Sequence, residues 1–197
     1  MQHAPAVEYP LPRGAAIPPA VVPWQPDPRR CALLVHHIHP HTLGTLAPGV
    51  RHHLLHNITR IAARCREVGI PIVTTCPADS HTIPPAPHRD ETTIAACRDN
   101  AFLHTDLDAW LRGRHRDQLL ICGVYAHTNC LMTAAHASIT DRQPFVVADG
   151  TADRSPDEHH AALQYIAYRC GLTISTETAI QALAAAAPQP HPHLNAA

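Results

Sequence analysis

Two histidines and one cysteine stand where short apolar runs end, and these residue types can do chemistry together. The histidines, His37 and His39, close the run CALLVHHIH, and Cys130 follows the run DQLLICGVY by a few residues. If the first run is a strand, residues two apart project to the same side. His37 could then act as the base that activates Cys130, as in a Cys–His dyad. Alternatively, His37, His39 and Cys130 could bind zinc and leave one position open, or they could have no catalytic role.

Cys130 lies near the predicted start of a helix that follows a buried strand. Unpaired amides and the helix dipole at such a place favour a thiolate and stabilise an oxyanion. Tyr125 and the amides near Asn129 would orient or stabilise the reacting group. The alternative is that Cys130 is a buried, small apolar residue, which is the usual place of a cysteine.

The composition limits the class of protein. The chain has 197 residues, 45% of them hydrophobic, and a formal charge of −1, and its fifteen basic residues are all arginine. This length predicts one domain. The chain has no run of basic residues that would favour binding to nucleic acid or to an anionic membrane. No apolar run approaches the ~20 residues of a membrane span. A cytoplasmic protein with reduced, mostly buried cysteines is expected. The eighteen histidines partly reflect compositional bias.

The chain divides into a proline-rich arm at 1–30, a domain at 31–187 and a tail at 188–197. Within the domain, apolar runs alternate with segments of helical periodicity. We expect strands at 31–38, 70–76, 117–125, 144–150 and 172–176, and helices at 49–69, 105–114, 127–142, 155–171 and 176–187. The second of these helices would be capped by Thr105, and the fourth would open at Ser155.

This alternation predicts an α/β fold with three layers, in which helices cover both faces of a mainly parallel sheet in Rossmann-like order. Ligands of such folds bind beyond the carboxyl ends of the strands, here at 36–41, 76–81 and 123–130. Asp79, His81 and His88 form a weaker metal-binding hypothesis. The remaining histidine groups, 52–56 and 159–160, lie at polar helical positions and are expected to be solvated.

Several segments in order resemble the isochorismatase family of the cysteine hydrolase superfamily, and specifically its phenazine and aryl-siderophore branch. They are YPLP at 9–12, LLVHHIH at 33–39, AFLHTDL at 101–107, RDQLLICGVYAHTNCL at 116–131 and PFVVADGTADRSPDEHHAAL at 144–163. The resemblance implies an isochorismatase-like α/β fold and an enzyme whose site uses an aspartate and a lysine. It also places Cys130 at the nucleophilic cysteine of the wider superfamily.

The departures from the family fall where the chemistry would be. The branch's strand motif LLVHDMQ has His37 here in place of the aspartate and His39 in place of the glutamine. Ala96 takes the lysine position, and the chain contains no lysine that could substitute. Cys76 takes the place of a substrate-binding glutamine. The stretch between Asp79 and Thr92, which carries an aromatic lid in the family, is about two dozen residues shorter here.

The resemblance and its departures together predict an altered enzyme of bacterial secondary metabolism. It would act on a small cyclic carboxylate or acyl substrate through Cys130, His37, Tyr125 and Asn129, with substrate contacts from His39, Cys76, Arg98 and His127. No cofactor is expected, with zinc as the alternative, and the partners would be a small molecule and a second copy in a homodimer or larger oligomer. The other hypothesis is a catalytically inactive protein that binds a metabolite or a protein partner.

Overall fold

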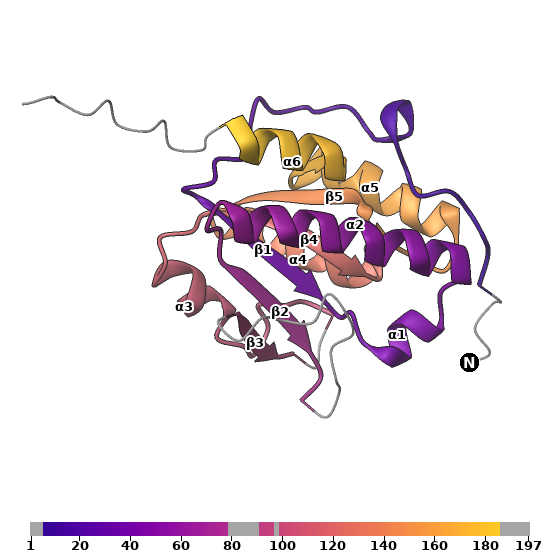
Figure 1. Ribbon diagram of the computed structural model, residues 1–197, viewed down its shortest axis with the longest axis horizontal. Helices are drawn as coiled ribbons and strands as arrows, with labels where there is room; N and C mark the ends of the chain where they lie inside the picture. Colours follow the sequence, from indigo (N-terminus) through magenta and orange to yellow (C-terminus); the bar gives the residue numbers. More distant parts are fainter. Residues whose placement is uncertain (1–5, 79–90, 97–98, 186–197) are drawn as a thin grey trace, which may run out of the picture.

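A computed structural model describes residues 6–78, 91–96 and 99–185 (Figure 1). Its centre is a sheet in the order β3-β2-β1-β4-β5-β6, and each neighbouring pair runs parallel. The strands are β1 Cys31–His36, β2 Ile72–Cys76, β3 Thr92–Ala95, β4 Gln118–Val124, β5 Gln143–Ala152 and β6 Leu172–Ile174. The predicted parallel α/β fold is confirmed.

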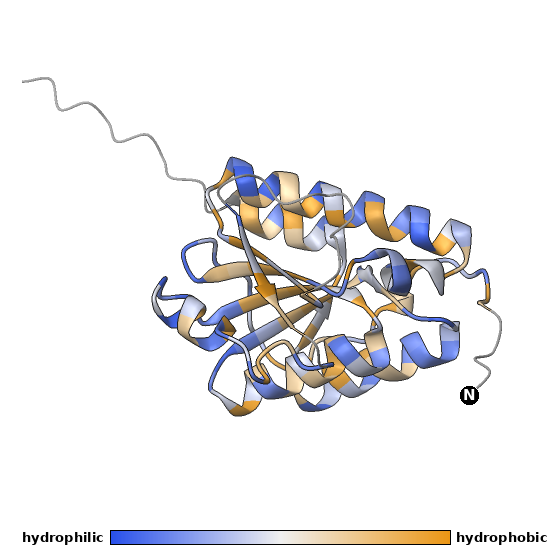
Figure 2. Cartoon of the chain, turned by 90° about the horizontal axis from the view of Figure 1, so that it is seen from below, coloured by the Kyte–Doolittle hydropathy of each residue, from blue (hydrophilic) through white to orange (hydrophobic). Residues whose placement is uncertain are grey.

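Helices cover both faces of this sheet. They are α1 Pro40–Gly44, α2 Pro48–Glu67, α3 Leu107–Arg112, α4 Leu131–Ile139, α5 Pro156–Arg169 and α6 Thr176–Ala185. Alternate residues of β1 divide the core: Leu33 and Val35 pack with α2 and α6, whereas Ala32 and Leu34 pack with α3, α4 and α5. Figure 2 shows the result, with apolar strands inside and hydrophilic outer helix faces. No described helix is both long and apolar enough to cross a membrane.

Some predicted boundaries differ from the observed ones. The short elements α1 and β3 were not predicted. The helix expected at 127–142 is divided into a π-helical turn, Ala126–Cys130, and α4. The helix expected from Thr105 begins after Asp106. The Thr105 hydroxyl accepts from the amide of Leu107, the first helical residue, at 3.3 Å and donates to the Ala101 carbonyl at 2.6 Å. Short elements carry too little periodicity to be recognised from spacing alone.

The described part of the N-terminal arm packs on its own domain. Leu11 is buried, the Trp24 ring meets Phe145 edge-on, and the Thr173 hydroxyl donates to the Pro18 carbonyl at 3.2 Å. Figure 1 shows this segment, in indigo, running past α5 and α6. The apolar side chains of this part of the arm are therefore covered within one chain.

The end of β4 lies unusually close to the end of β1, and this brings the candidate site together. Gly123 pairs with His36 and has a φ of +148°, a conformation that residues with a side chain rarely adopt. A Cβ atom at Gly123 would lie 2.1 Å from the His36 carbonyl oxygen. Glycine is therefore required where the two strands approach each other most closely.

Candidate functional site

His36 is a buried link between three segments at the carboxyl edge of the sheet. Its Nδ1 lies 2.5 Å from Thr75 Oγ1 on β2, and its Nε2 lies 3.3 Å from the Asp99 carbonyl. Burial, and to a lesser degree the neighbouring His37, lowers the pKa of His36 to about 3. A neutral imidazole thus joins β1, β2 and the segment after β3. The sequence analysis missed this role, although its position before the expected base was a signal.

His37 does not continue the strand. β1 ends at His36, and His37 has a φ of +56°, with its amide donating to the Thr75 carbonyl at 2.9 Å. The Thr42 hydroxyl donates to the His37 carbonyl at 2.6 Å and fixes the turn. The prediction that His37 and His39 alternate along one strand is wrong, because the chain turns between them.

The imidazoles nevertheless gather at the end of β1. The ring centroids of His36 and His37 are 4.4 Å apart, and those of His37 and His39 are 5.6 Å apart. His37 and His39 are both buried, and His39 stands immediately before α1. The edge where the family resemblance implies an acid is thus occupied by adjacent imidazoles.

Cys76 closes β2 beside this cluster. Its side chain is buried, and burial raises the pKa of the Cys76 thiol. The Cys76 carbonyl accepts a hydrogen bond from the Ala96 amide at 2.9 Å, so the position expected for the family lysine lies next to the end of β2. The remaining predicted contacts at this edge, Arg98 and the group Asp79, His81 and His88, lie outside the described residues.

The turn after β4 is braced by its own side chains. It begins with a cis peptide bond between Val124 and Tyr125. The Asn129 amide group donates to the Val124 carbonyl at 2.6 Å, and the backbone amide of Cys130 donates to the Tyr125 carbonyl at 3.1 Å. The Tyr125 hydroxyl lies 2.7 Å from Thr45 Oγ1. The Asn129 side chain therefore holds the turn, and the Cys130 amide is already engaged.

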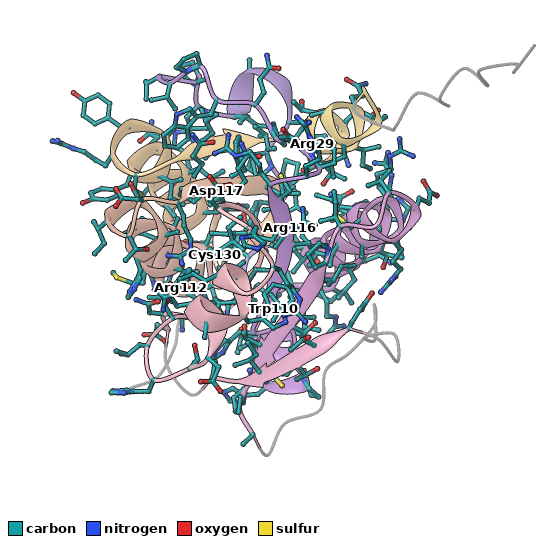
Figure 3. The ribbon with its side chains drawn as sticks, turned by 90° about the vertical axis from the view of Figure 1, so that its left-hand side faces the viewer. Arg29, Trp110, Arg112, Arg116, Asp117 and Cys130 are labelled. Carbon is teal, nitrogen blue, oxygen red and sulfur yellow. The ribbon has the colours of Figure 1, made fainter. Side chains whose placement is uncertain are left out.

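Cys130 points into the core rather than into a reactive environment. Its side chain is 0% exposed and belongs to the apolar cluster that includes Leu34 and Ala134, as its interior place in Figure 3 illustrates. Burial, with the nearby Asp153 carboxylate, raises the pKa of the Cys130 thiol well above its usual range. The start of the helix was expected to favour a thiolate with a lowered pKa. The apolar environment favours the neutral thiol, because the cost of desolvating the charge outweighs the effect of the helix dipole.

A different group of side chains has atoms close enough together to bind one metal ion. Among the described residues, only His127, Asp153 and Glu158 bring three such atoms within 4.8 Å of one another. His37, His39 and Cys130 do not form such a group, so the alternative zinc site proposed for them lacks the required geometry.

His127 is held by Asp153 at the end of β5. The buried Asp153 carboxylate accepts from the His127 backbone amide at 2.8 Å and lies 2.7 Å from its Nδ1. Tyr9 of the arm completes the arrangement: its hydroxyl accepts from the Asp153 amide at 2.9 Å and lies 3.0 Å from His159 Nδ1. His127 was predicted to bind substrate, and its ring remains partly exposed at this edge.

His159 corrects another expectation. It was predicted on a solvated helix face, but its side chain is fully buried and its Nε2 lies 3.1 Å from Thr151 Oγ1. Burial lowers the pKa of His159 to about 4. The arm covers this part of α5, and helical periodicity cannot reveal cover from a segment 150 residues away. The group at 52–56 is exposed at each histidine, as expected.

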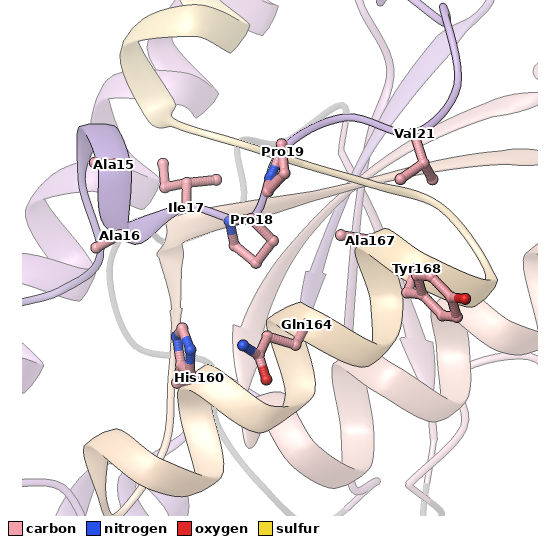
Figure 4. A pocket seen from close by; sticks show the side chains of 10 residues that line it. All are labelled: Ala15, Ala16, Ile17, Pro18, Pro19, Val21, His160, Gln164, Ala167 and Tyr168. Atoms are coloured by element: carbon pink, nitrogen blue, oxygen red, sulfur yellow. The ribbon is translucent and has the colours of Figure 1, made fainter.

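Two grooves lie away from this edge. One, of about 420 Å³, runs between the arm and α5 and is lined by residues such as Ile17, Pro18 and Tyr168 (Figure 4). The other, of about 660 Å³, lies where α3 and α4 end and includes Arg112, Arg116 and His136. In the second groove cations and carboxylates are mixed, as the ion pairs of Asp108 with Arg112 and Arg142 show. Neither groove is lined by the catalytic residues predicted from the sequence.

Comparisons with known proteins agree with the fold. The isochorismatase domain family matches residues 80–178. The chain is 34% identical over 198 residues to phenazine biosynthesis protein PhzD1 of Pseudomonas aeruginosa, covering 88% of this chain and 96% of that protein. It is 31% identical over 202 residues to enterobactin synthase component B of Escherichia coli, covering 88% of this chain and 70% of that protein.

A solved structure extends the comparison to three dimensions. A cysteine hydrolase from Pseudomonas syringae superposes with a TM-score of 0.75 at 18% identity, covering 91% of this chain and all of that chain. At this identity the likeness shows a shared fold. The sequence identity to PhzD1, over nearly the whole length of that protein, is stronger evidence for the family than the shared fold. It confirms the expectation of an isochorismatase-like enzyme. This chain belongs to the isochorismatase family.

Proposed function

We propose that this chain is an isochorismatase-like enzyme of bacterial secondary metabolism that acts on a small cyclic carboxylate or acyl substrate, with His37 as its general acid–base. The observation that carries this proposal is the group of adjacent imidazoles at the end of β1, with His37 at the position that the family resemblance gives to an aspartate. The names of the relatives in phenazine and enterobactin biosynthesis support secondary metabolism as the setting.

An imidazole suits this role because it can both give and take a proton near neutral pH. The backbone of His37 is fixed by hydrogen bonds at its amide and its carbonyl, to β2 and α1 respectively. Since the chain contains no lysine, the aspartate–lysine pair of the family cannot operate. The chemistry proposed is therefore not ordinary isochorismate hydrolysis.

The proposed chemistry also differs from the Cys–His dyad predicted from the sequence. Cys130 is enclosed by apolar side chains, and a buried neutral thiol is a poor nucleophile. We therefore assign proton transfer to His37 and packing to Cys130. His39 and His127 remain proposed substrate contacts, and Tyr125 keeps its proposed role of orienting the reacting group, because each follows the carboxyl end of a strand.

One observation favours a second candidate, a family member that binds a metabolite without turning it over. Two backbone amides of the turn after β4 already have acceptors: that of His127 donates to Asp153, and that of Cys130 donates to the Tyr125 carbonyl. Fewer donors are thus left to stabilise an oxyanion. Binding without product formation would distinguish this candidate from the enzyme.

A His37→Gln variant tests the proposal, with His53→Gln as the control because His53 is an exposed histidine on α2. Both variants and the wild type would be assayed for product formation from a panel of cyclic carboxylates and their esters. We expect His37→Gln to lose about 10²- to 10⁴-fold in turnover, and His53→Gln to match the wild type. Equal turnover by His37→Gln would remove His37 from the mechanism.

We further propose that the chain forms a homodimer through α4 and α5 and works in the cytoplasm without a cofactor. Met132 and Ile139 are seven residues apart on α4, and Tyr165 and Tyr168 are three apart on α5, which are spacings of one helix face. All are large and exposed, with Ile139 at 81% and Tyr168 at 71%. Such a concentration of apolar side chains on neighbouring helices is typical of an interface.

A further inference from the structure

Arg154 is a cation placed at the carboxyl edge of the sheet by contacts on both sides of its backbone. It lies two residues after the end of β5, and its amide donates to Asp153 Oδ1 at 2.9 Å. Its carbonyl accepts from the Val7 amide of the arm at 3.1 Å. The site of Arg154 is therefore fixed by the fold and not by a mobile loop.

The guanidinium of Arg154 lies over the ring of Tyr125, with its central carbon 5.2 Å from the ring centroid. Tyr125 itself reaches from the end of β4 to the segment after α1, where its hydroxyl lies 2.7 Å from Thr45 Oγ1. The guanidinium therefore lies over a ring that reaches from the end of β4 to the segment after α1, and the order of the strands changes direction between β1 and β4. Ligands of open parallel sheets bind at that crossing point.

The chemistry of this arrangement suits a carboxylate. A guanidinium that lies over an aromatic ring keeps its N–H groups in its own plane, and two of them match the two oxygens of a carboxylate. Because the chain has no lysine, a side chain that stays positively charged throughout the physiological pH range must be an arginine.

The nearby acidic groups have hydrogen-bond donors of their own. The Asp153 carboxylate accepts from His127 and from the Arg154 amide, and Glu158 Oε2 accepts from the Ser155 hydroxyl at 3.0 Å.

From this geometry we propose that Arg154, supported by Tyr125, binds the carboxylate of the substrate and determines the preference of the enzyme for anionic over neutral cyclic compounds. This proposal rests on the proposed function, because it names the group that would recognise the carboxylate of that substrate class. Arg154 would be a specificity residue, whereas His37 would carry the proton transfer.

Isothermal titration calorimetry with benzoate and its neutral counterpart benzamide tests the proposal. The variant is Arg154→Gln, and the matched control is Arg169→Gln, because the Arg169 guanidinium lies 5.0 Å from the Tyr168 ring on α5 in the same kind of contact. We expect the wild type to prefer benzoate, and Arg154→Gln to bind benzoate about 10- to 100-fold more weakly. Benzamide binding and the control variant should be unchanged.

The possible outcomes separate this inference from the proposed function. If Arg154→Gln binds benzoate as the wild type does, or if the wild type prefers benzamide, Arg154 does not recognise the carboxylate, and the proposed function stands. If the wild type binds neither probe, both the inference and the proposed substrate class are wrong. An Arg154→Lys variant adds a check on geometry: it should fall between the wild type and Arg154→Gln, because an ammonium keeps the charge but lacks the paired N–H groups.

Discussion

Two histidines that are adjacent in the sequence have different parts in this molecule. His36 is locked between Thr75 and the Asp99 carbonyl, and its lowered pKa keeps it neutral. His37 takes a left-handed backbone conformation that turns the chain away from the strand. The sequence alone could not separate these roles, because the alternation of a strand predicts the direction of a side chain only as far as the strand continues.

The first prediction concerns pH and His36. Its folded-state pKa of about 3 lies below the ordinary value of 6.5, so the unfolded chain takes up this proton first as the pH falls. The stabilising contribution should be complete above pH 6.5 and be lost progressively toward pH 3, by at most about 1.4 kcal/mol per pH unit. Urea unfolding at several pH values should show that the free energy of unfolding falls less steeply with decreasing pH for His36→Gln than for the wild type. The exposed-site variant His53→Gln is the reference. The same pH dependence in His36→Gln and the wild type would contradict the assignment.

The second prediction concerns Cys130. Because its thiol is buried and its pKa is raised, iodoacetamide at pH 7.5 should leave Cys130 unmodified in the folded protein and modify it in urea. Mass spectrometry of tryptic peptides measures this directly. Cys130→Ala should keep turnover within about twofold while lowering the free energy of unfolding by about 1 kcal/mol through lost packing. Rapid alkylation of the folded protein would restore the thiolate mechanism.

At the scale of elements, the turn Ala126–Cys130 explains why the site was harder to predict than the fold. The strand before it and the helix after it are evident from their apolar patterns. The turn itself is π-helical, so the rotation per residue is not that of the α-helix that the spacing implied. Whether Asn129 or Cys130 faces the core depends on that rotation, and no sequence pattern specified it.

The third prediction concerns the contact between the arm and β5. Tyr9→Phe removes the hydroxyl that contacts the backbone amide of Asp153 and His159 Nδ1. Leaving these groups without that partner should lower the free energy of unfolding by about 1–3 kcal/mol. Tyr168→Phe, which changes an exposed tyrosine on α5, is the control and should change stability little. Equal stability of the two variants in urea would show that the arm does not secure this edge.

At the scale of the whole molecule, most of the architecture followed from the alternation of buried strands with amphipathic helices. The parallel sheet and the edge that carries the histidines were predicted in this way. The contacts of the arm were not, because they join residues far apart in the chain, such as Tyr9 and His159. Proline content predicts that a segment is extended but not where it packs.

The fourth prediction concerns assembly. If α4 and α5 form the interface, light scattering at micromolar concentration should give about twice the chain mass of 21.4 kDa. Ile139→Arg should shift the mass toward the monomer, because it places a charge within an apolar contact. The control is Val21→Arg, an exposed apolar position on the arm. A wild-type protein that is monomeric at this concentration would contradict the proposed interface.

The most direct test of the account is an assay of the purified wild-type protein with isochorismate itself. The account proposes that the family scaffold is kept while the aspartate–lysine chemistry is lost. The sequence resemblance gives those two positions to His37 and Ala96, and the chain has no lysine. Each missing acid–base group is worth about 10²- to 10⁴-fold in rate. Turnover of isochorismate should therefore be lower, by at least about 10²-fold, than that of the isochorismatase of Bacillus subtilis assayed in parallel. Hydrolysis at a rate equal to that of the Bacillus enzyme would contradict the account.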